Sequence, residues 1–410
     1  MAFLTDQIPA SGVPINSWVH IVDPSDISQN PAGSSFKATI QQVISGYTGS
    51  TIYEVGSGAD SSQRIGVSSS SVGNCSVVSG GFNNTSFSTT SFIGSGSNNF
   101  TNGTASVVTG GRGNATETDY SSIIGGCGNM IKNLTSTTNV YGNTIAGGAF
   151  NTITSGSSTS DLFGNTIAGG TFNTIIPVLS GGQTISGGVS NTNDSDYSSI
   201  SGGYNNTSSG RGSTIGGGSY NTAAGTRSVV SGGGGSCPAL GNRSTCVSTF
   251  VGGGTQNNVS GSYSSVVGGG GPLLGMGNSV TESYSTVVGG SCNTVNCSYS
   301  VITGGVKNII NGNCSSVLGG CGNVINGNSS FIMSCNSTIS SDRTVILGGS
   351  GISGSTNDMV YVPSVNIQST GYLYFGDVNT DGSWRMFISG ATLMVEKRTG
   401  GVWTFSGQFT

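Results

Sequence analysis

Short apolar segments recur along this chain at nearly constant spacing, and each of them ends in a pair of glycines. The recurring phrase is Ser-x-Ile/Val-x-Gly-Gly-x-x-Asn, with seventeen copies between about Ser76 and Gly349. Most copies are 15 residues apart, but the intervals lengthen to 18–22 residues from Gly125 to Gly187 and to 17–20 residues from Gly232 to Gly289. A repeat of this kind predicts a solenoid whose coils stack on one another.

The apolar position of the phrase predicts one inward-facing column. Aligning the copies on the first glycine, with the pairs of the second long stretch placed at Gly252 and Gly269, puts Val or Ile two residues earlier in sixteen copies and Phe250 in one. A small residue such as Ser76 lies two positions before that, on the same side of a strand. β-branched residues suit a packed, pleated surface, so we expect a short strand. The predicted core column is Val78, Val108, Ile123, Ile145, Ile167, Ile185, Ile200, Ile215, Val287, Ile302 and Val317.

The glycine pair and the asparagine predict the turn that follows this strand. Glycine takes positive φ without steric cost, and asparagine tolerates the same region while bonding to nearby backbone. Asparagine stands four residues after the first glycine in twelve copies, so stacked coils should align these amides in a hydrogen-bonded ladder. A second short apolar stretch often follows, which gives each coil two strands and two turns. The predicted ladder is Asn84, Asn114, Asn129, Asn151, Asn173, Asn221, Asn293, Asn308 and Asn323.

Composition excludes several other architectures and partners. The 73 glycines oppose a helical fold, and the absence of a glycine at every third position opposes collagen. Only 7% of the 410 residues are charged, with 12 Lys+Arg against 16 Asp+Glu, so we expect no nucleic-acid partner. We also expect no membrane span, because no apolar run approaches about 20 residues, and no secretion signal in residues 1–9.

The nine cysteines do not form a zinc motif. The chain contains no Cys-x-x-Cys, and its single histidine is His20, outside the repeats. Cys127 and Cys321 both stand two residues after a first glycine, at a turn position. They are interpreted as small residues accepted in turns, with disulfides within or between subunits as the alternative. No cofactor is expected.

The periodicity divides the chain into three parts. Residues 1–73 hold four prolines and are predicted to be a lead-in or attachment segment. Residues 74–354 are the solenoid, whose longer coils should form loops that serve either for recognition or as tolerated insertions. Residues 355–410 alternate aromatic and apolar residues with Asn/Asp/Gly turns and are predicted to be a small β domain that caps the solenoid.

Candidate chemistry is sparse. Asp377, Asn379 and Asp381 match the first half of a calcium-binding loop, but Ile388 stands where that loop needs a bidentate glutamate, so a plain hairpin turn is the favoured interpretation. The repeats hold few carboxylates; Glu117 with Asp119 and Asp194 with Asp196 are interpreted as solubilising charges. We therefore predict that the protein is not an enzyme.

The glycine phrase resembles the head repeats of trimeric autotransporter adhesins. That resemblance implies a parallel β-roll and three associated chains. Segments 18–38 and 381–385 are similar to parts of phage and giant-virus fibre proteins. Together they imply a homotrimeric fibre on the virion surface, bound to other virion proteins through its N-terminal segment and attaching to a host glycan or protein. A bacterial or extracellular surface adhesin is the alternative, and a glycan-degrading β-helical spike is a second one.

Overall fold

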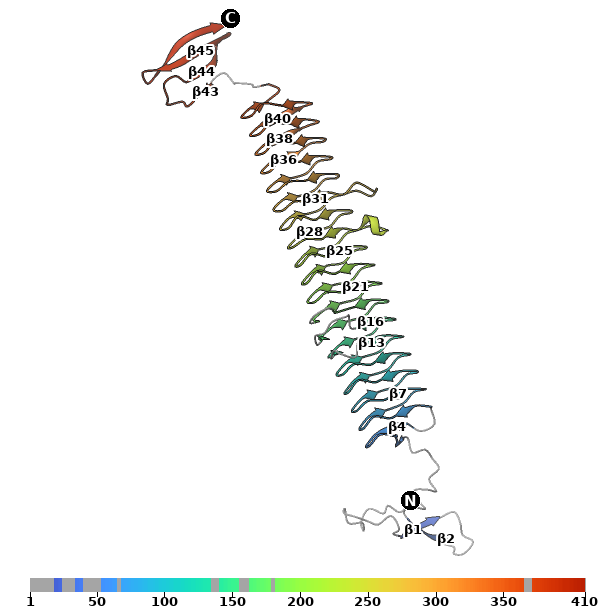
Figure 1. Ribbon diagram of the computed structural model, residues 1–410. Helices are drawn as coiled ribbons and strands as arrows, with labels where there is room; N and C mark the ends of the chain where they lie inside the picture. The colour runs from blue at the N-terminus through green and yellow to red at the C-terminus, as the bar shows by residue number, and fades with distance from the viewer. Residues whose placement is uncertain are drawn as a thin grey trace. The chain divides into compact units, whose positions relative to one another are not determined.

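The computed structural model describes residues 18–23, 34–39, 53–64, 68–133, 140–154, 162–177, 181–364 and 371–409. Within them the chain is all-β: about 18 parallel coils form a β-solenoid, and a small antiparallel sheet of four strands follows (Figure 1). The predicted fold class is confirmed. The chain divides into two compact units, residues 1–208 and 209–410, which are described separately below.

Each coil is built from two very short strands, and strand β10 (Val107–Val108) shows the principle. It pairs in parallel with β8 (Phe92–Ile93) of the preceding coil and β12 (Ser122–Ile123) of the following coil, always in the same register. The second strand of this coil, β11 (Ala115–Thr116), joins a separate parallel ladder. In both strands the second residue is buried and the first points outward, as the two-residue period of a strand requires.

The N-terminal unit begins with an antiparallel pair and continues into the coils. Strands β1 (Trp18–Asp23) and β2 (Ser34–Thr39) pair with each other, and β3 (Tyr53–Val55) pairs antiparallel with β4 (Ser62–Arg64). Most of the predicted attachment segment falls outside the described residues. The first-strand ladder continues through β6 (Val77–Val78), β8, β10, β12, β15 (Thr144–Ile145), β18 (Thr166–Ile167), β20 (Thr184–Ile185) and β22 (Ser199–Ile200).

The second-strand ladder of this unit contains β5 (Ser70–Ser71), β7 (Thr85–Ser86), β9 (Phe100–Thr101), β11, β13 (Met130–Lys132), β16 (Thr152–Thr154), β19 (Thr174–Ile175), β21 (Thr192–Asn193) and β23 (Thr207–Ser208). The two 22-residue coils add a further parallel pair, β14 (Val140–Tyr141) with β17 (Leu162–Phe163). Their other extra residues lie largely outside the described ranges, so the predicted recognition loops there stay a prediction.

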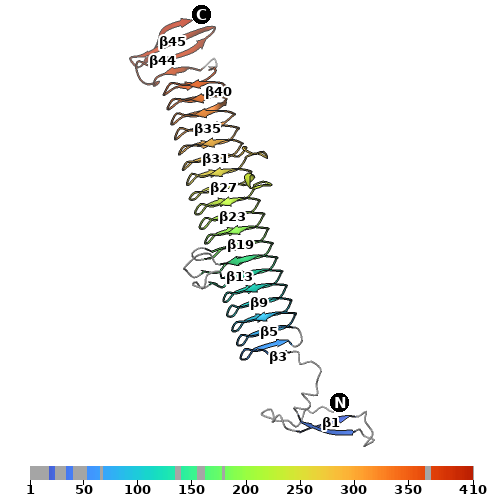
Figure 2. The same ribbon diagram turned by 45° about the vertical axis from the view of Figure 1, so that its right-hand side comes forward.

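The C-terminal unit repeats the same two ladders (Figure 2). Its first-strand ladder contains β24 (Thr214–Ile215), β26 (Val229–Val230), β28 (Phe250–Val251), β30 (Ser265–Val266), β32 (Thr286–Val287), β34 (Val301–Ile302), β36 (Ser316–Gly319), β38 (Phe331–Cys335), β40 (Val345–Ser350) and β42 (Val360–Tyr361). Its second-strand ladder contains β25 (Thr222–Ala223), β27 (Arg243–Ser244), β29 (Asn258–Val259), β31 (Ser279–Val280), β33 (Thr294–Val295), β35 (Ile309–Ile310), β37 (Val324–Ile325), β39 (Thr338–Ile339) and β41 (Ser353–Gly354). Parallel pairing thus begins at Ser62 in the N-terminal unit and ends at Tyr361 in the C-terminal unit, a little outside the predicted bounds 74 and 354.

The last four strands form one antiparallel sheet in the order β43 (Leu373–Phe375), β44 (Trp384–Ser389), β45 (Thr392–Thr399) and β46 (Val402–Phe409). On one face the Arg385 guanidinium lies 4.3 Å from the Tyr372 ring centre and 4.7 Å from that of Trp403, and its Nε donates to Glu396 at 2.6 Å. Ser383 is the only buried residue among residues 371–409. This sheet therefore has no packed apolar layer within the chain as described.

Candidate functional site

The interior of the solenoid is lined by fully buried side chains in the described coils. All eleven residues of the predicted core column have no exposed surface. The same column includes Ile93, Val230, Ile332 and Ile346, also fully buried. Each of these first strands turns one β-branched side chain inward.

The nine predicted ladder asparagines are all completely buried, and Asn293 shows how they bond. Its Nδ2 donates to the Gly289 carbonyl of its own coil at 3.0 Å and to the Gly305 carbonyl of the next coil at 2.9 Å. Its Oδ1 accepts the backbone N–H of Asn308 at 3.1 Å. Buried polar groups must be paired to be tolerated, and here each amide satisfies backbone groups of two coils. The role of these asparagines is structural.

Sequence reasoning missed three members of this ladder: Asn242, Asn257 and Asn278. Asn242 donates to Gly232 O at 2.9 Å and Asn278 to Gly268 O at 3.0 Å, each across an insertion of six residues. The insertions are residues 235–240, which include the 3₁₀ turn η1 (Pro238–Leu240), and residues 271–276. Both project from the same side of the coils (Figure 1). Counting back four residues leads to Gly253 from Asn257, but to Pro238 and Leu274 from the other two, so the insertions hid Asn242 and Asn278 from the repeat pattern.

The same insertions led to a wrong alignment of two copies. Phe250 is 36% exposed whereas Val251 is fully buried, and Val267 is 47% exposed whereas Val266 is fully buried. The first glycines there are thus Gly253 and Gly268, not the residues assigned from sequence. The error arose because runs of three or four glycines offer more than one possible pair. With the correction, every described coil from Val78 to Ile346 buries Val or Ile in the first strand.

The second glycine of each pair is the one that the turn requires. Gly81 has φ of 87° and Gly126 of 95°. A Cβ at Gly81 would lie 2.0 Å from the carbonyl oxygen of Gly96 in the next coil. The position therefore needs glycine both for its backbone conformation and for the close approach of the neighbouring coil.

The predicted calcium residues serve a turn in this structure. The Asp377 Oδ1 accepts the N–H of Asn379 at 2.8 Å, while both carboxylate oxygens of Asp381 accept backbone N–H groups, from Gly400 at 2.9 Å and Gly401 at 3.0 Å. The Asp377 contact is that of a local turn, whereas Asp381 holds the loop between β45 and β46. Among the described residues, no cluster of three or more His, Cys, Asp or Glu side chains is arranged to hold a metal ion.

The repeat carboxylates also bond to turn backbone. Asp119 accepts the N–H of Thr104 at 2.7 Å, and Asp196 accepts the N–H of Gly181 at 3.1 Å. Asp194 is different, because its Oδ1 is buried without a partner in the described chain and burial raises the pKa of its carboxyl group. The contacts of Asp119 and Asp196 are therefore structural hydrogen bonds to the backbone of an adjacent coil.

Exposed aromatic side chains form regular rows at the turns. Tyr263, Tyr284 and Tyr299 occupy the same turn of successive coils, with ring centres 5.2 and 5.0 Å apart and planes within 6° of parallel. Each ring is more than half exposed. Phe150 and Phe172 form a shorter row at the other turn, 5.2 Å apart and also about half exposed. We call the first group the tyrosine row.

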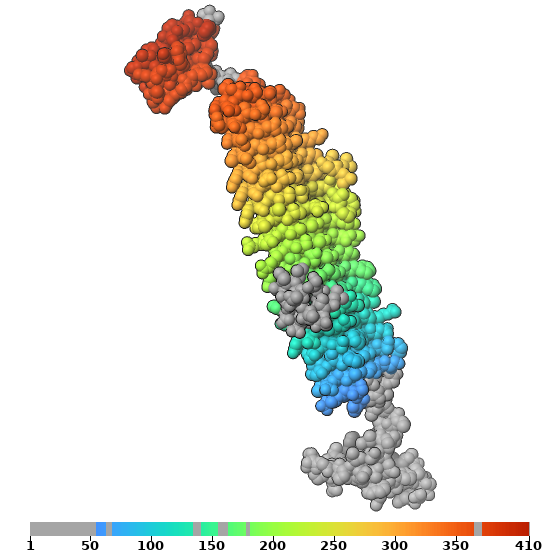
Figure 3. Space-filling model, viewed as in Figure 1, coloured from blue at the N-terminus to red at the C-terminus, as the bar shows by residue number. Residues whose placement is uncertain are grey.

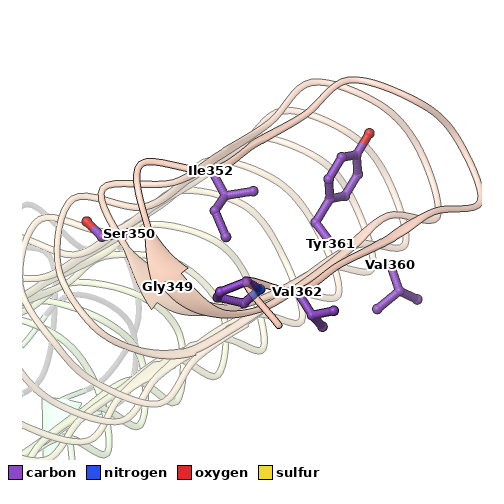
Figure 4. A pocket seen from close by; sticks show the side chains of 7 residues that line it. Gly349, Ser350, Ile352, Val360, Tyr361 and Val362 are labelled. Atoms are coloured by element: carbon purple, nitrogen blue, oxygen red, sulfur yellow. The ribbon is translucent and has the colours of Figure 1, made fainter. Parts of the chain in front are cut away.

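A second exposed feature runs along the outer face of the first-strand ladder in the C-terminal unit. We call it the apolar column: Val267, Val288, Leu318, Met333 and Leu347, each 37–49% exposed. Beside it lie two shallow hollows, one lined by Leu318, Met333, Cys335 and glycines, the other by Ile352, Val360, Tyr361, Val362 and Pro363 (Figure 4). The coils otherwise form closely packed ridges on the face seen in Figure 3.

Comparisons with known proteins do not assign this chain to a family. No family model matches the chain, and no curated protein matches it. Within the described residues there is no helix of the length and apolar character that crossing a bilayer requires. The candidate functional features are therefore the tyrosine row and the apolar column, both on the solenoid surface.

Proposed function

We propose that this protein is a structural viral fibre or tail-fibre-like component that presents a host-attachment surface. The observation that carries the proposal is the contrast between a filled, hydrogen-bonded interior and regular rows of exposed aromatic rings. A rigid repeat scaffold of this type provides an extended binding surface without any catalytic centre. The resemblance of the repeats to adhesin heads, and of the terminal segments to viral fibres, supports the same function.

The attachment surface is assigned to the tyrosine row, with a host-surface glycan or protein as its ligand. Tyrosine presents a large apolar ring and a hydrogen-bonding hydroxyl at low entropic cost, which suits exposed recognition surfaces. The three tyrosine residues have positive φ values of 58–59° at this turn. The coil, and not the stacking of the side chains, therefore fixes their backbone conformation. Binding would then require no rearrangement of the scaffold.

Binding to a glycan array and to host cells tests this assignment. Tyr284→Ser removes the central ring of the row and should lower binding at least tenfold while the circular dichroism spectrum stays unchanged. Tyr120→Ser is the matched control, because that exposed tyrosine holds the same turn position with φ of 52°, while Ala105 and Gly142 occupy the equivalent positions of the adjacent coils. Equal binding by wild type and Tyr284→Ser would refute the assignment. Release of sugar from a bound glycan would instead favour a glycan-degrading spike.

The fibre is proposed to be a homotrimer in which the apolar column is covered by neighbouring copies. Contiguous exposed apolar surface on a soluble protein commonly marks a protein interface, and the C-terminal sheet also lacks a packed layer. Sedimentation velocity tests this: Leu318→Lys with Met333→Lys should convert trimer to monomer. Ser231→Lys, an exposed residue at the equivalent position of another coil, should leave the trimer intact. A wild-type monomer would contradict the proposal.

The N-terminal segment is proposed to bind other virion proteins, which places the fibre on the virion surface. Immunogold labelling of purified virions, compared with labelling of cell surfaces, tests the location. Labelling confined to cell surfaces would favour the alternative, an extracellular adhesin of the kind that the repeats resemble.

A further inference from the structure

The coil register brings two of the nine cysteines together. All nine lie within the described residues, and only Cys321 and Cys335 are separated by the length of the coil in which they stand. Two residues before the cysteines, Gly319 is in register with Met333. Three residues after them, Val324 is in register with Thr338. Both pairs are 14 residues apart, so Cys321 and Cys335 are also aligned in neighbouring coils.

Local hydrogen bonds show the same alignment. The backbone N–H of Cys321 donates to the Cys335 sulfur at 3.2 Å, and the Cys321 carbonyl accepts the N–H of Asn336 at 2.6 Å. One coil earlier, the equivalent N–H of Val306 donates to the Gly320 carbonyl at 3.0 Å. The shortened coil therefore replaces a regular backbone bond with a contact to sulfur. The turn at Cys321 is held less firmly by its backbone than the turns before it.

This turn also belongs to the last pair of coils that the buried asparagine ladder bridges. Asn323 still donates to the Ser334 carbonyl of the next coil at 2.6 Å. In that next coil Ser337 takes the asparagine position, and its shorter side chain reaches only Cys335 O and the N–H of Ile352. A covalent tie at Cys321 would strengthen the stack where the amide ladder ends.

We propose that Cys321 and Cys335 form a disulfide that joins these two coils. Adjacent parallel strands are about 4.8 Å apart, which lies within the range of roughly 4.4–6.8 Å between the Cα atoms of bonded cysteines. With a disulfide oxidant such as oxidised glutathione, each thiol loses its proton and together they lose two electrons. One S–S bond forms, the S–S bond of glutathione breaks, and two reduced glutathione molecules leave.

Exposure and thiol chemistry are compatible with this reaction. Cys321 is exposed, and Cys335 is half-buried beside the hollow next to Met333. A hydrogen bond with the Cys335 side chain raises the pKa of the Cys321 thiol. The disulfide should therefore form faster as pH rises and more of the thiol is present as thiolate. Cys297, by contrast, is buried and directs its sulfur at the Gly312 carbonyl, 3.0 Å away. It should stay reduced.

Peptide mapping of the native full chain tests the proposal. After treatment with oxidised glutathione, alkylation and tryptic cleavage at Lys307 and Arg343, the peptide 308–343 contains three cysteines. We expect one alkyl group, on Cys314, and a mass lower by two hydrogens than that of the same peptide after reduction with only Cys314 alkylated. Chymotryptic cleavage after Phe331 should then leave two fragments joined only through sulfur.

Two variants make the result specific. Cys335→Ser should leave both Cys314 and Cys321 alkylated, whereas Cys314→Ser should leave the cross-link in place. Alkylation of all three cysteines in the oxidised wild-type chain would overturn the proposal, and so would a bridge that involves Cys314. Because the wild-type measurement alone gives either outcome, the test does not depend on the folding of a variant.

Discussion

Two sets of coils bury different residues in the second strand while sharing the same first strand. In the polar-lined coils of the N-terminal unit the inward residues are Ser86, Thr101 and Thr116; in the apolar-lined coils of the C-terminal unit they are Val280, Val295, Ile310 and Ile325. Both sets keep the Val/Ile column and the asparagine ladder. The comparison isolates what the second inward position contributes.

The buried serine before the first strand changes its partner between the two sets. In a polar-lined coil the Ser91 hydroxyl bonds to Ser86 Oγ at 2.7 Å, and its N–H donates to Ser88 O of the same coil at 3.4 Å. In an apolar-lined coil the N–H of Ser300 donates to Ser285 Oγ of the preceding coil at 3.1 Å. At Ser91 the polar lining therefore closes hydrogen bonds within a coil, whereas at Ser300 the apolar lining leaves the serine to link successive coils. Ser121, beside Thr116, also accepts from the next coil, where the N–H of Asn143 lies 3.2 Å away.

The largest expected effect comes from truncating the apolar lining. Ile310→Ala should lower the free energy of unfolding by about 2–5 kcal/mol, through lost burial and the cavity left behind. Thr101→Ala, the control in a polar-lined coil, removes a hydroxyl contact with Ser86 of 3.1 Å and should cost about 1 kcal/mol. Urea denaturation followed by circular dichroism measures both. Equal losses would mean that the second column contributes alike in the two regions.

The asparagine ladder should contribute equally to the free energy of unfolding in both sets of coils. Asn99→Ala and Asn293→Ala should each cost about 2–4 kcal/mol, because buried backbone groups lose their partners. Asn296→Ala is the control: its exposed amide donates only to Asn311 Oδ1, at 3.0 Å, and its loss should be small. The same denaturation experiment applies. A much larger loss at Asn293 than at Asn99 would show that the ladder depends on the second column.

Amide hydrogen exchange separates the two serine arrangements. Ser300→Ala removes the acceptor of the Ser315 N–H, which lies 3.1 Å from Ser300 Oγ, and should speed exchange at Ser315 about fivefold for a bond worth about 1 kcal/mol. Ser91→Ala should leave exchange at Ser106 unchanged, because that N–H donates to Gly103 O. Faster exchange at both amides would show that Ser91 and Ser300 do not differ in the hydrogen bonds that they make.

The smallest effect concerns Asp194 in a polar-lined coil. Burial raises the pKa of this carboxyl above its ordinary value of 3.8, so the folded chain loses stability as pH rises through that value and the folded-state pKa. Asp194→Asn should therefore be more stable than wild type at pH 7 and equally stable at pH 3. Solvent screening limits the difference to less than about 0.5 kcal/mol. Thermal melts at the two pH values measure it, and greater stability of wild type at pH 7 would contradict the sign.

The repeat phrase was sufficient to predict the solenoid because each of its positions has one physical use. A Val/Ile column, a glycine with positive φ and a buried amide together allow few other folds. The second strand was predicted as a short apolar stretch, but its polar-lined coils were not, since residues as different as Ser86, Asn193 and Ile310 fill its inward position. No apolar period marks such a column in the sequence, and its character depends on which partner the neighbouring serine finds.

The register of some strands was the other feature that the sequence did not predict correctly. Placing Phe250 inside the coil was wrong because glycine runs permit a shift of one residue, and a shift of one turns a strand over. The alignment of Cys321 with Cys335 likewise depends on a 14-residue coil, which the sequence marks only through a degenerate glycine pair. For the tyrosine row, the regular phrase Ser-Tyr-Ser was visible, but its stacking required the coil geometry.

The two six-residue insertions have a consequence for engineering. Asn242 and Asn278 still reach the carbonyls of Gly232 and Gly268 across them, at 2.9 and 3.0 Å. The turn between the glycine pair and the asparagine thus lengthens while both ladders keep their register, and loop closure becomes only slowly more costly with length. This turn is a natural graft point: foreign peptides inserted between Gly234 and Gly241 would be carried at a defined height on the scaffold.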